Sequence, residues 1–256
     1  MREDWNQEER EEVSLKNFFG VRAVIEAIKA GKEIDKVLFK TGSDGETIHE
    51  LFSLVRNLGI PYQFVPIEKL NRITRKNHQG VIALASAVEY QPLSALIPMI
   101  YERGEDPFLV ILDRVTDVRN VGAIARSAEC AGAHALIVPD RGSAPLNGDA
   151  VKTSAGALHH LPVCRSGNLK NDLLFLKESG IRVVAVTEKS DITYLQADLQ
   201  GPVALLMGAE DTGISPEYLR LCHERVSIPM FGKIGSLNVS AAAAVLLFDV
   251  VRRRTT

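Results

Sequence analysis

Hydrophobic and polar positions along the 256-residue chain follow two alternating spacings, one typical of strands and one typical of helices. Short apolar runs such as Val203-Ala-Leu-Leu-Met-Gly208 indicate buried strands. Between these runs, apolar residues three or four positions apart indicate amphipathic helices. Regular alternation of the two patterns predicts an α/β fold in which helices cover both faces of a parallel sheet.

The predicted elements form two blocks. In residues 17–88 the spacing predicts helices at 20–31, 46–59 and 67–74 and strands at 36–40, 62–65 and 80–85, enough for a small α/β domain. Residues 89–107 have the prolines, glycine and acidic residues of a linker, with a short helix within it. Residues 1–16 are rich in Glu and Arg, so we expect a flexible charged tail.

The second block, residues 108–256, contains the longer series of elements. Strands are expected at 108–113, 135–139, around Val163, and at 182–187, 203–208 and 226–229. Helices are expected at 121–132, 169–180, 216–222 and 239–253, with an irregular helical stretch at 149–158. The near-continuous apolar strands favour a parallel sheet buried on both faces.

Composition narrows the class of protein. The chain is 46% hydrophobic and 24% charged, as in ordinary soluble domains. It shows neither an apolar run long enough to span a bilayer nor a secretion signal. Cys130, Cys164 and Cys222 are scattered, which is typical of free thiols in a reducing cytoplasm and argues against a zinc site. Residues 17–88 hold ten Lys and Arg against seven Asp and Glu; this weak surplus fits a phosphate backbone or simply a solvated surface.

Several kinds of chemistry lack their motifs. The sequence has no Gly-x-Gly pair, no Gly-Lys-Ser/Thr and no Gly-x-Ser-x-Gly, so dinucleotide binding, P-loop hydrolysis of nucleotides and serine hydrolysis are not indicated. His159 and His160 suggest a metal, but adjacent residues of a strand would point to opposite faces, and no carboxylate lies at ligand spacing. We therefore expect structural histidines and no metal.

Three polar or glycine-rich segments follow predicted strands of the second block, at the edge of the sheet where ligands bind in such folds. They are residues 113–126, 208–213 and 228–242. In the first, Asn120 could cap the following helix, whereas Arg119 and Arg126 lie close to a helix N-terminus, where positive charge is unfavourable without an anionic partner. A cap or turn explains each segment taken alone, but three such segments at one edge favour a site.

The last of these segments joins a strand end to an Ala- and Val-rich helix. Gly232 and Gly235 permit positive φ or a close ligand. Ser236, Asn238 and Ser240 are residues that cap helix N-termini. The segment is therefore either a well-capped junction or a loop that holds a small polar ligand with its main chain.

The three segments resemble, in order and spacing, motifs one, two and three of the SpoU (TrmH) branch of the SPOUT RNA methyltransferases. Ser236-Leu-Asn-Val-Ser240 after Ile228-Pro-Met is the most specific match. Phe19-Gly-Val-Arg-Ala-Val-Ile-Glu-Ala and His78-Gln-Gly-Val are similar to stretches of the small substrate-binding domain of RlmB-type members. The resemblance covers residues 17–254, with Val118 in place of the usual proline of motif one.

The resemblance implies a parallel sheet with a C-terminal trefoil knot, a homodimer, and S-adenosylmethionine as cofactor. Residues 17–88 would then be the RNA substrate-binding domain and residues 108–256 the methyltransferase domain. Matched position by position, the cofactor-binding residues are Gly208, Ile228, Met230, Ser236, Leu237 and Asn238.

The implied reaction is methylation of a ribose 2′-hydroxyl in RNA, not DNA, closest to the type that modifies a guanosine of 23S rRNA. The family assigns proton removal to the position of Arg126, oriented by Asn120. Because arginine is hard to deprotonate, we expect Arg126 to pair with a phosphate and stabilise the developing alkoxide instead. Glu210 would orient Asn120 or Arg126, or contact the partner subunit.

Two alternatives remain open from the sequence. One is methylation of a tRNA guanosine, against which the N-terminal block argues, because tRNA-modifying members often carry other extensions. The other is a catalytically silent RNA-binding protein of ribosome assembly, which the presence of all the matched polar residues makes less attractive.

Overall fold

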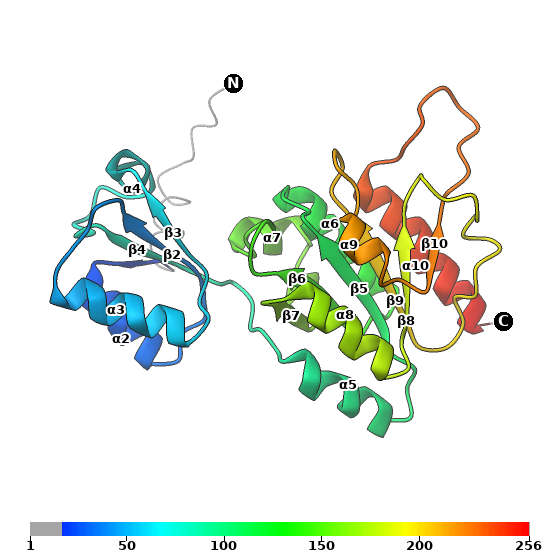
Figure 1. Ribbon diagram of the computed structural model, residues 1–256, viewed down its shortest axis with the longest axis horizontal. Helices are drawn as coiled ribbons and strands as arrows, with labels where there is room; N and C mark the ends of the chain where they lie inside the picture. The colour runs from blue at the N-terminus through cyan, green and yellow to red at the C-terminus, as the bar shows by residue number, and fades with distance from the viewer. Residues whose placement is uncertain (1–16, 256) are drawn as a thin grey trace. The chain divides into compact units, whose positions relative to one another are not determined.

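The computed structural model describes residues 17–255, and these fall into two compact units with a boundary between Ala87 and Val88 (Figure 1). The expected charged tail, residues 1–16, lies outside the described residues. Across the described residues, no helix has both the length and the apolar character needed to cross a membrane.

The first unit is a four-stranded mixed sheet with helices on both faces. Its elements are β1 (Phe18–Phe19), α2 (Val21–Lys29), β2 (Ile34–Lys40), α3 (Glu46–Asn57), β3 (Tyr62–Val65), α4 (Ile67–Ile73) and β4 (Val81–Ala85). The strand order is β1-β4-β2-β3, with β2 parallel to β3 and antiparallel to β4. Apolar residues of α2 and α3 are buried on one face, and Leu70 of α4 is buried on the other. The small α/β domain predicted from the spacing is thus present, with β1 as an additional short strand.

The second unit contains a six-stranded, fully parallel sheet in the order β10-β8-β9-β5-β6-β7. Its strands are β5 (Phe108–Asp113), β6 (Ala135–Pro139), β7 (Val163–Ser166), β8 (Arg182–Val186), β9 (Val203–Gly208) and β10 (Glu224–Val226). Its helices are α5 (Leu93–Glu102), α6 (Val118–Cys130), α7 (Gly148–Thr153), the 3-10 turn η1 (Ala157–His159), α8 (Leu169–Glu178), α9 (Pro216–Leu219) and α10 (Val239–Thr255). The predicted parallel α/β sheet is therefore confirmed.

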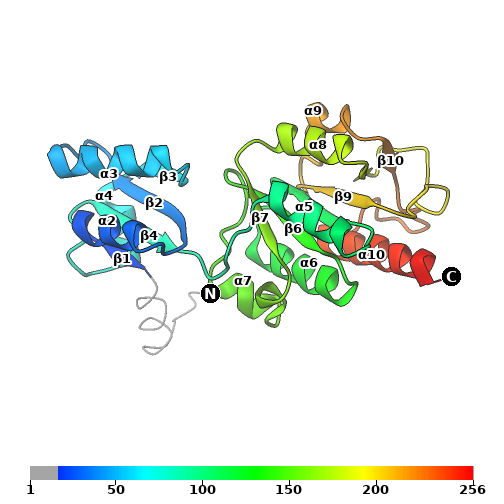
Figure 2. The ribbon, with the colours of Figure 1, turned by 90° about the horizontal axis from the view of Figure 1, so that it is seen from below.

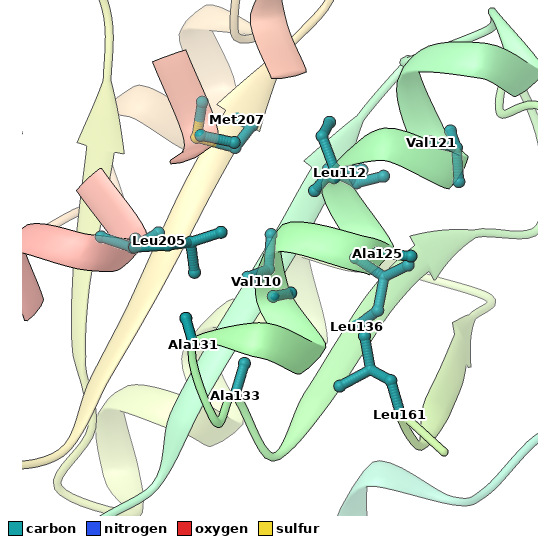
Figure 3. Close-up of a cluster of buried hydrophobic side chains, with 14 of the residues drawn as sticks. Val110, Leu112, Val121, Ala125, Ala131, Ala133, Leu136, Leu161, Leu205 and Met207 are labelled. Carbon is teal, nitrogen blue, oxygen red and sulfur yellow. The ribbon is translucent and has the colours of Figure 1, made fainter. Parts of the chain in front are cut away.

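Both faces of this sheet are covered. Helices α6, α7 and α10 pack on one face, and α5 and α8 pack on the other (Figure 2). Every residue of β5 and β9 is buried, which explains why their sequences are almost continuously apolar. Figure 3 shows Leu112 of β5 next to Val121 of α6 and Val110 next to Ala125 of the same helix, with Leu205 and Met207 of β9 in the same cluster. This core fixes the carboxyl ends of β5 and β9 side by side.

Residues 89–107, predicted as a linker, hold α5, and this helix belongs to the second unit. Leu96, Ile97 and Ile100 of α5 are buried in the core on one face of the parallel sheet. The helix continues through Pro98. The prolines that suggested a connecting segment thus lie just before a packed helix and within it.

Three local predictions were wrong. Helix α6 starts at Val118, because the carboxylate of Asp117, not the side chain of Asn120, accepts the Arg119 backbone N–H at 2.8 Å. The strand expected at 226–229 is β10, which ends at Val226. His159 ends the 3-10 turn η1 and His160 follows it, so the argument from strand geometry does not apply to this pair.

The end of α10 is anchored to the start of the sheet. Asp249 is 8% exposed and accepts from Arg252 and Arg253. Arg253 and Arg254 donate to main-chain oxygens of the loop between β8 and β9 and of the segment before β5, those of Tyr194, Leu195, Ala197, Gly201, Asp106 and Pro107. These bonds fix α10 along its own axis relative to the strands.

Candidate cofactor and catalytic site

The three segments singled out in the sequence meet at the carboxyl edge of the parallel sheet. Strand β5 ends at Asp113 and the neighbouring strand β9 ends at Gly208, with these two residues in register. The third segment leads from β10 into α10, which packs beside α6 on the same face of the sheet (Figure 1). The first and third segments, more than a hundred residues apart in the sequence, therefore lie at the same edge of the sheet.

Asn238 joins all three segments through hydrogen bonds. Its side-chain nitrogen donates to Oδ1 of Asn120 at 3.0 Å and to Oε1 of Glu210 at 2.5 Å. Asn120 is 9% exposed, on the inner side of α6, whereas Glu210 is exposed. Both hydrogens of one amide group are thus used to position a residue of each of the other two segments.

The same side chain caps α10. Oδ1 of Asn238 accepts the backbone N–H of Ser240 at 2.9 Å and its hydroxyl at 2.5 Å. An asparagine at this position satisfies one of the helix's otherwise unpaired N–H groups. Capping and cross-linking therefore fix the orientation of the Asn238 amide, and neither excludes the other.

A cavity of about 100 Å³ lies next to this cluster. Five of the six residues predicted to bind the cofactor line it, namely Gly208, Ile228, Met230, Ser236 and Leu237, while Asn238 lies in the adjoining hydrogen-bonded cluster. Glu210 also lines the cavity. Thr187 and Glu188, which directly follow β8, line it as well and were not predicted. Their only signal in the sequence is their position directly after a buried strand.

The backbone of Gly208 lies so close to the backbone of residues 213 and 214 that no residue with a side chain fits at this position. A Cβ atom at this position would lie 2.3 Å from the carbonyl carbon of Gly213 and 2.4 Å from the nitrogen of Ile214. Both neighbours are backbone atoms, so a small rotation of a side chain cannot relieve the clash. The loop 209–213 consequently lies directly over the end of β9.

The segment between β10 and α10 is open to solvent. Phe231 is 98% exposed and Ile234 is 76% exposed. The cavity beneath is smaller than the roughly 300–1,000 Å³ of typical small-molecule sites. A larger ligand would therefore need residues 229–237 to move outward, and their exposure leaves them room to do so.

A second network ties the first segment to the loop after β9. Asp113, 2% exposed, accepts the Ser215 backbone N–H at 2.6 Å and the Arg114 guanidinium at 3.0 Å. Arg114 also donates to the Gly213 carbonyl at 3.1 Å. The hydrogen bond to Asp113 raises the pKa of Arg114 above its ordinary value. Asp113 and Arg114 thus hold the loop after β9 against the end of β5. Sequence spacing alone does not reveal this role.

Arg119 and Arg126, the two arginines of the first segment that lie in α6, differ in their surroundings. The guanidinium of Arg119 lies 2.9 Å from the carboxylate of Asp117. This anionic partner offsets the unfavourable position of a positive charge near a helix N-terminus. This contact lowers the pKa of Asp117. Arg126, six residues along α6 from Asn120, is exposed and makes no hydrogen bond or ion pair with any residue between 17 and 255. The structure therefore brings Asn120, Glu210 and Asn238 together but leaves Arg126 outside their network.

Comparison with known proteins gives matches across nearly the whole chain. Residues 107–248 match the SpoU rRNA Methylase family, and residues 18–91 match the RNA 2′-O ribose methyltransferase substrate binding family. The chain is 38% identical over 237 residues to the 23S rRNA (guanosine-2′-O-)-methyltransferase RlmB of Yersinia pestis, an alignment spanning 90% of this chain and 96% of that protein.

Solved structures show the same similarity. One is the SpoU methyltransferase AviRb from Streptomyces viridochromogenes in complex with AdoMet, with a TM-score of 0.58, 27% identity, and coverage of 98% of this chain and 94% of that one. Another is the AdoMet-bound rRNA methyltransferase from Sinorhizobium meliloti, with a TM-score of 0.60, 27% identity, and coverage of 97% and 91%.

Proposed function

The chain belongs to the SpoU rRNA methylase family, and we propose that it transfers a methyl group from S-adenosylmethionine to the ribose 2′-hydroxyl of a guanosine in 23S rRNA. The observation that carries the proposal is the Asn238 cluster, in which residues of all three motifs are hydrogen-bonded beside one cavity. The likeness to a 23S rRNA methyltransferase along 90% of the chain supports rRNA, rather than tRNA, as the substrate.

The residues around the cavity suit S-adenosylmethionine in kind. Gly208, at the end of β9, lines the cavity together with Ile228 and Leu237, and we assign main-chain contacts with the ligand to these three residues. Met230 contributes an apolar surface and Ser236 a polar group, while Asn238 positions Glu210, which also lines the cavity. When bound, S-adenosylmethionine supplies an activated methyl group on a positively charged sulfur.

The chain's own residues must position the ribose and stabilise the oxygen as it loses its proton. A ribose hydroxyl is a weak acid, so alignment and electrostatic stabilisation both lower the barrier. We assign the electrostatic part to Arg126, whose guanidinium is exposed and has no protein partner in the described chain. Its planar fork suits a phosphate next to the reacting ribose. Asn120 and Glu210, held by Asn238, orient the groups around the hydroxyl.

A homodimer fits the exposed apolar surface at α10 and the segment before it. Apolar side chains are exposed on the segment before α10 and on α10 itself, those of Phe231, Ile234, Leu237, Val245 and Phe248. Val245 and Phe248 are three positions apart and so share one face of the helix. A second copy of the chain that covers this surface would bury these apolar side chains, including those of the segment that lines the cavity. Light scattering of the purified protein would show twice the chain mass if this part of the proposal holds.

We further propose that residues 17–88 bind the RNA substrate, that residues 108–256 form the methyltransferase domain, and that the C-terminal part forms the trefoil knot of this family. Free Cys130, Cys164 and Cys222 support a location in the reducing cytoplasm.

Incubation with S-adenosylmethionine carrying a labelled methyl group, and with either deproteinised 23S rRNA or total tRNA, tests the function. We expect label in 23S rRNA, and mapping of ribose methylation should place it on one guanosine. Label in tRNA alone would show the tRNA-modifying alternative. Cofactor binding without transfer to either RNA would overturn the proposed reaction and favour a catalytically silent RNA-binding protein.

A further inference from the structure

The first unit contains a cavity that the methyl-transfer site does not use. It has a volume of about 830 Å³ and opens where β2 ends. Its walls are the turn that follows β2, the turn that precedes β4, and the first residues of α2. Its size is within the range of sites that hold a nucleotide-sized ligand.

The two stretches that link this unit to the substrate-binding family meet at this cavity. The first contributes Val21 and Arg22 to the wall, and the second contributes His78, Gln79 and Gly80. The backbone N–H of Gly20 donates to the Val81 carbonyl at 3.1 Å, which holds the two stretches together. Motifs sixty residues apart thus build one surface, and the folding of the sheet alone does not require polar residues there.

The wall formed by the second stretch is rigid. His78 is 8% exposed, its Nδ1 accepts the Gly80 backbone N–H at 3.1 Å, and its Nε2 bonds to Oδ1 of Asn71 at 2.9 Å. Gly80 lies against the opposite turn, since a Cβ atom there would be 3.0 Å from Oγ of Ser43. Gln79 adopts a positive φ of 48°, uncommon for a residue with a side chain. The cavity is therefore preformed rather than a gap between mobile loops.

The charges around the cavity favour an anion. Arg22, Lys40 and Lys76 line it, against one carboxylate, that of Asp44. Asp44 is already bonded to the Gly45 N–H and to His49. Arg22 and Lys40 are exposed and form no ion pair with another described residue. Two cations therefore face the cavity without a protein partner.

We propose that this cavity binds a phosphodiester segment of the RNA substrate, with Arg22 and Lys40 as the phosphate-contacting residues. The inference rests on the proposed function for the identity of the substrate, and adds to it a second place of contact outside the methyl-transfer site. Phosphate contacts of this kind fix the position of a nucleic acid without reading its sequence. Ser43, Asn77 and Gln79 add hydrogen-bonding groups at the same wall.

The test compares two charge-reversed pairs in the full chain. R22E/K40E changes the cavity, and K29E/K32E makes the same change of charge at the other end of α2, outside the cavity. Binding of end-labelled, deproteinised 23S rRNA is measured on filters at several salt concentrations. For R22E/K40E we expect affinity to fall about tenfold or more and the slope of log affinity against log salt to become shallower by about 1.4, the value for two single-strand phosphate contacts.

The control pair should retain most of the affinity and the slope of the wild type. R22E/K40E should also raise KM for RNA while leaving kcat and the affinity for S-adenosylmethionine close to those of the wild type. Circular dichroism checks folding, and if the reversed pair does not fold, R22Q/K40Q should show the same changes to a smaller degree. Equal affinity and slope in R22E/K40E and K29E/K32E would overturn the inference. Wild-type protein that binds RNA through the cavity but transfers no methyl group would instead overturn the proposed function alone.

Discussion

The side-chain nitrogen of Asn238 lies 3.0 Å from the side-chain oxygen of Asn120, although 118 positions separate the two residues in the sequence. Asn238 precedes α10 and Asn120 lies in the first turn of α6, so this bond links the starts of two helices that pack side by side. With Glu210 on the same nitrogen, the site is one hydrogen-bonded unit.

Replacement of Asn238 by alanine should affect stability and cofactor binding together. Loss of the cap costs about 1 kcal/mol of unfolding free energy. Asn120 and Glu210 also lose their shared donor, and we expect affinity for S-adenosylmethionine to fall about tenfold, since two hydrogen bonds that shape the cavity disappear. Urea denaturation measures the first effect and calorimetric titration the second.

Asn168 provides the matched control. It caps α8 through a bond from the Asn171 N–H at 3.2 Å and lies outside the cavity. N168A should lose a similar amount of stability and keep the wild-type cofactor affinity. If N238A likewise loses only stability, the residue is a helix cap and nothing more.

Arg126 should matter for turnover and not for cofactor binding. Because the Arg126 side chain is exposed and does not line the cavity, R126A should bind S-adenosylmethionine as the wild type does. Methyl transfer should fall by about 10²–10³ in kcat, the usual cost of removing one group that stabilises a developing negative charge. R126K keeps the positive charge but loses the planar guanidinium, so its kcat should lie between those of the wild type and R126A. Normal turnover by R126A would remove Arg126 from the mechanism.

Gly208 should tolerate no side chain. The added methyl group of G208A would meet backbone atoms of residues 213 and 214, so the loop after β9 must move. We expect a loss of about 2 kcal/mol in stability and loss of measurable cofactor binding. G148A is the control, since a Cβ atom at Gly148 meets nothing within 4 Å. A G208A variant with wild-type cofactor affinity would show that the loop does not form part of the cofactor site.

Stability should decline in mildly acidic solution because of His134. Its Nδ1 accepts the Phe108 backbone N–H at 3.0 Å, which requires an unprotonated nitrogen, and burial lowers its pKa despite the nearby Glu105 carboxylate. The folded state thus resists protonation more than the unfolded chain. The stabilisation is complete above the unfolded pKa of about 6.5 and is lost as the pH falls through the lower folded value. Urea denaturation should give a lower free energy of unfolding at pH 5.5 than at pH 7.5. In H134Q the difference in this free energy between the two pH values should be smaller.

Hydrogen exchange tests whether the segment before α10 moves over the cofactor. Residues 229–237 lie at the rim of a cavity that is small for its ligand, with Phe231 almost fully exposed. Addition of S-adenosylmethionine should slow amide exchange in this segment and in the loop 209–213, while the distant strand β7 should be unchanged. Equal exchange with and without the cofactor would place its binding elsewhere.

The strands and helices could largely be predicted because the apolar spacing that identifies each element lies within its own stretch of sequence. The run Phe108–Asp113 and the run Val203–Gly208 were predicted with the bounds that the structure has. The start of α6 was missed because Asp117 and Asn120 are both good caps, and only the actual hydrogen bond to the Arg119 N–H distinguishes them. Helix α5 was expected within a linker because burial of Ile97 depends on a sheet whose strands come later in the chain.

The site residues were chosen through resemblance, and their arrangement could not follow from spacing. No periodicity indicates that one amide of Asn238 reaches both Asn120 and Glu210. Thr187 and Glu188 were missed because their segment has neither glycine nor a capping pattern beyond its place after a strand. The division into substrate-binding, linking and methyltransferase segments, the roles of the six cofactor residues, the dimer and the knot stay predictions.

Arg253 and Arg254, at the far end of α10, set the axial register of Asn238. Arg253 and Arg254 follow Asn238 by 15 and 16 residues, so these anchors lie about 23 Å from it along the helix. A slip of one residue at the anchors would move Asn238 by about 1.5 Å along the axis and turn it by about 100°. Either change would break the bonds to Asn120 and Glu210. The hydrogen bonds of Arg253 and Arg254 at one end of α10 therefore hold Asn238 in position at the other end.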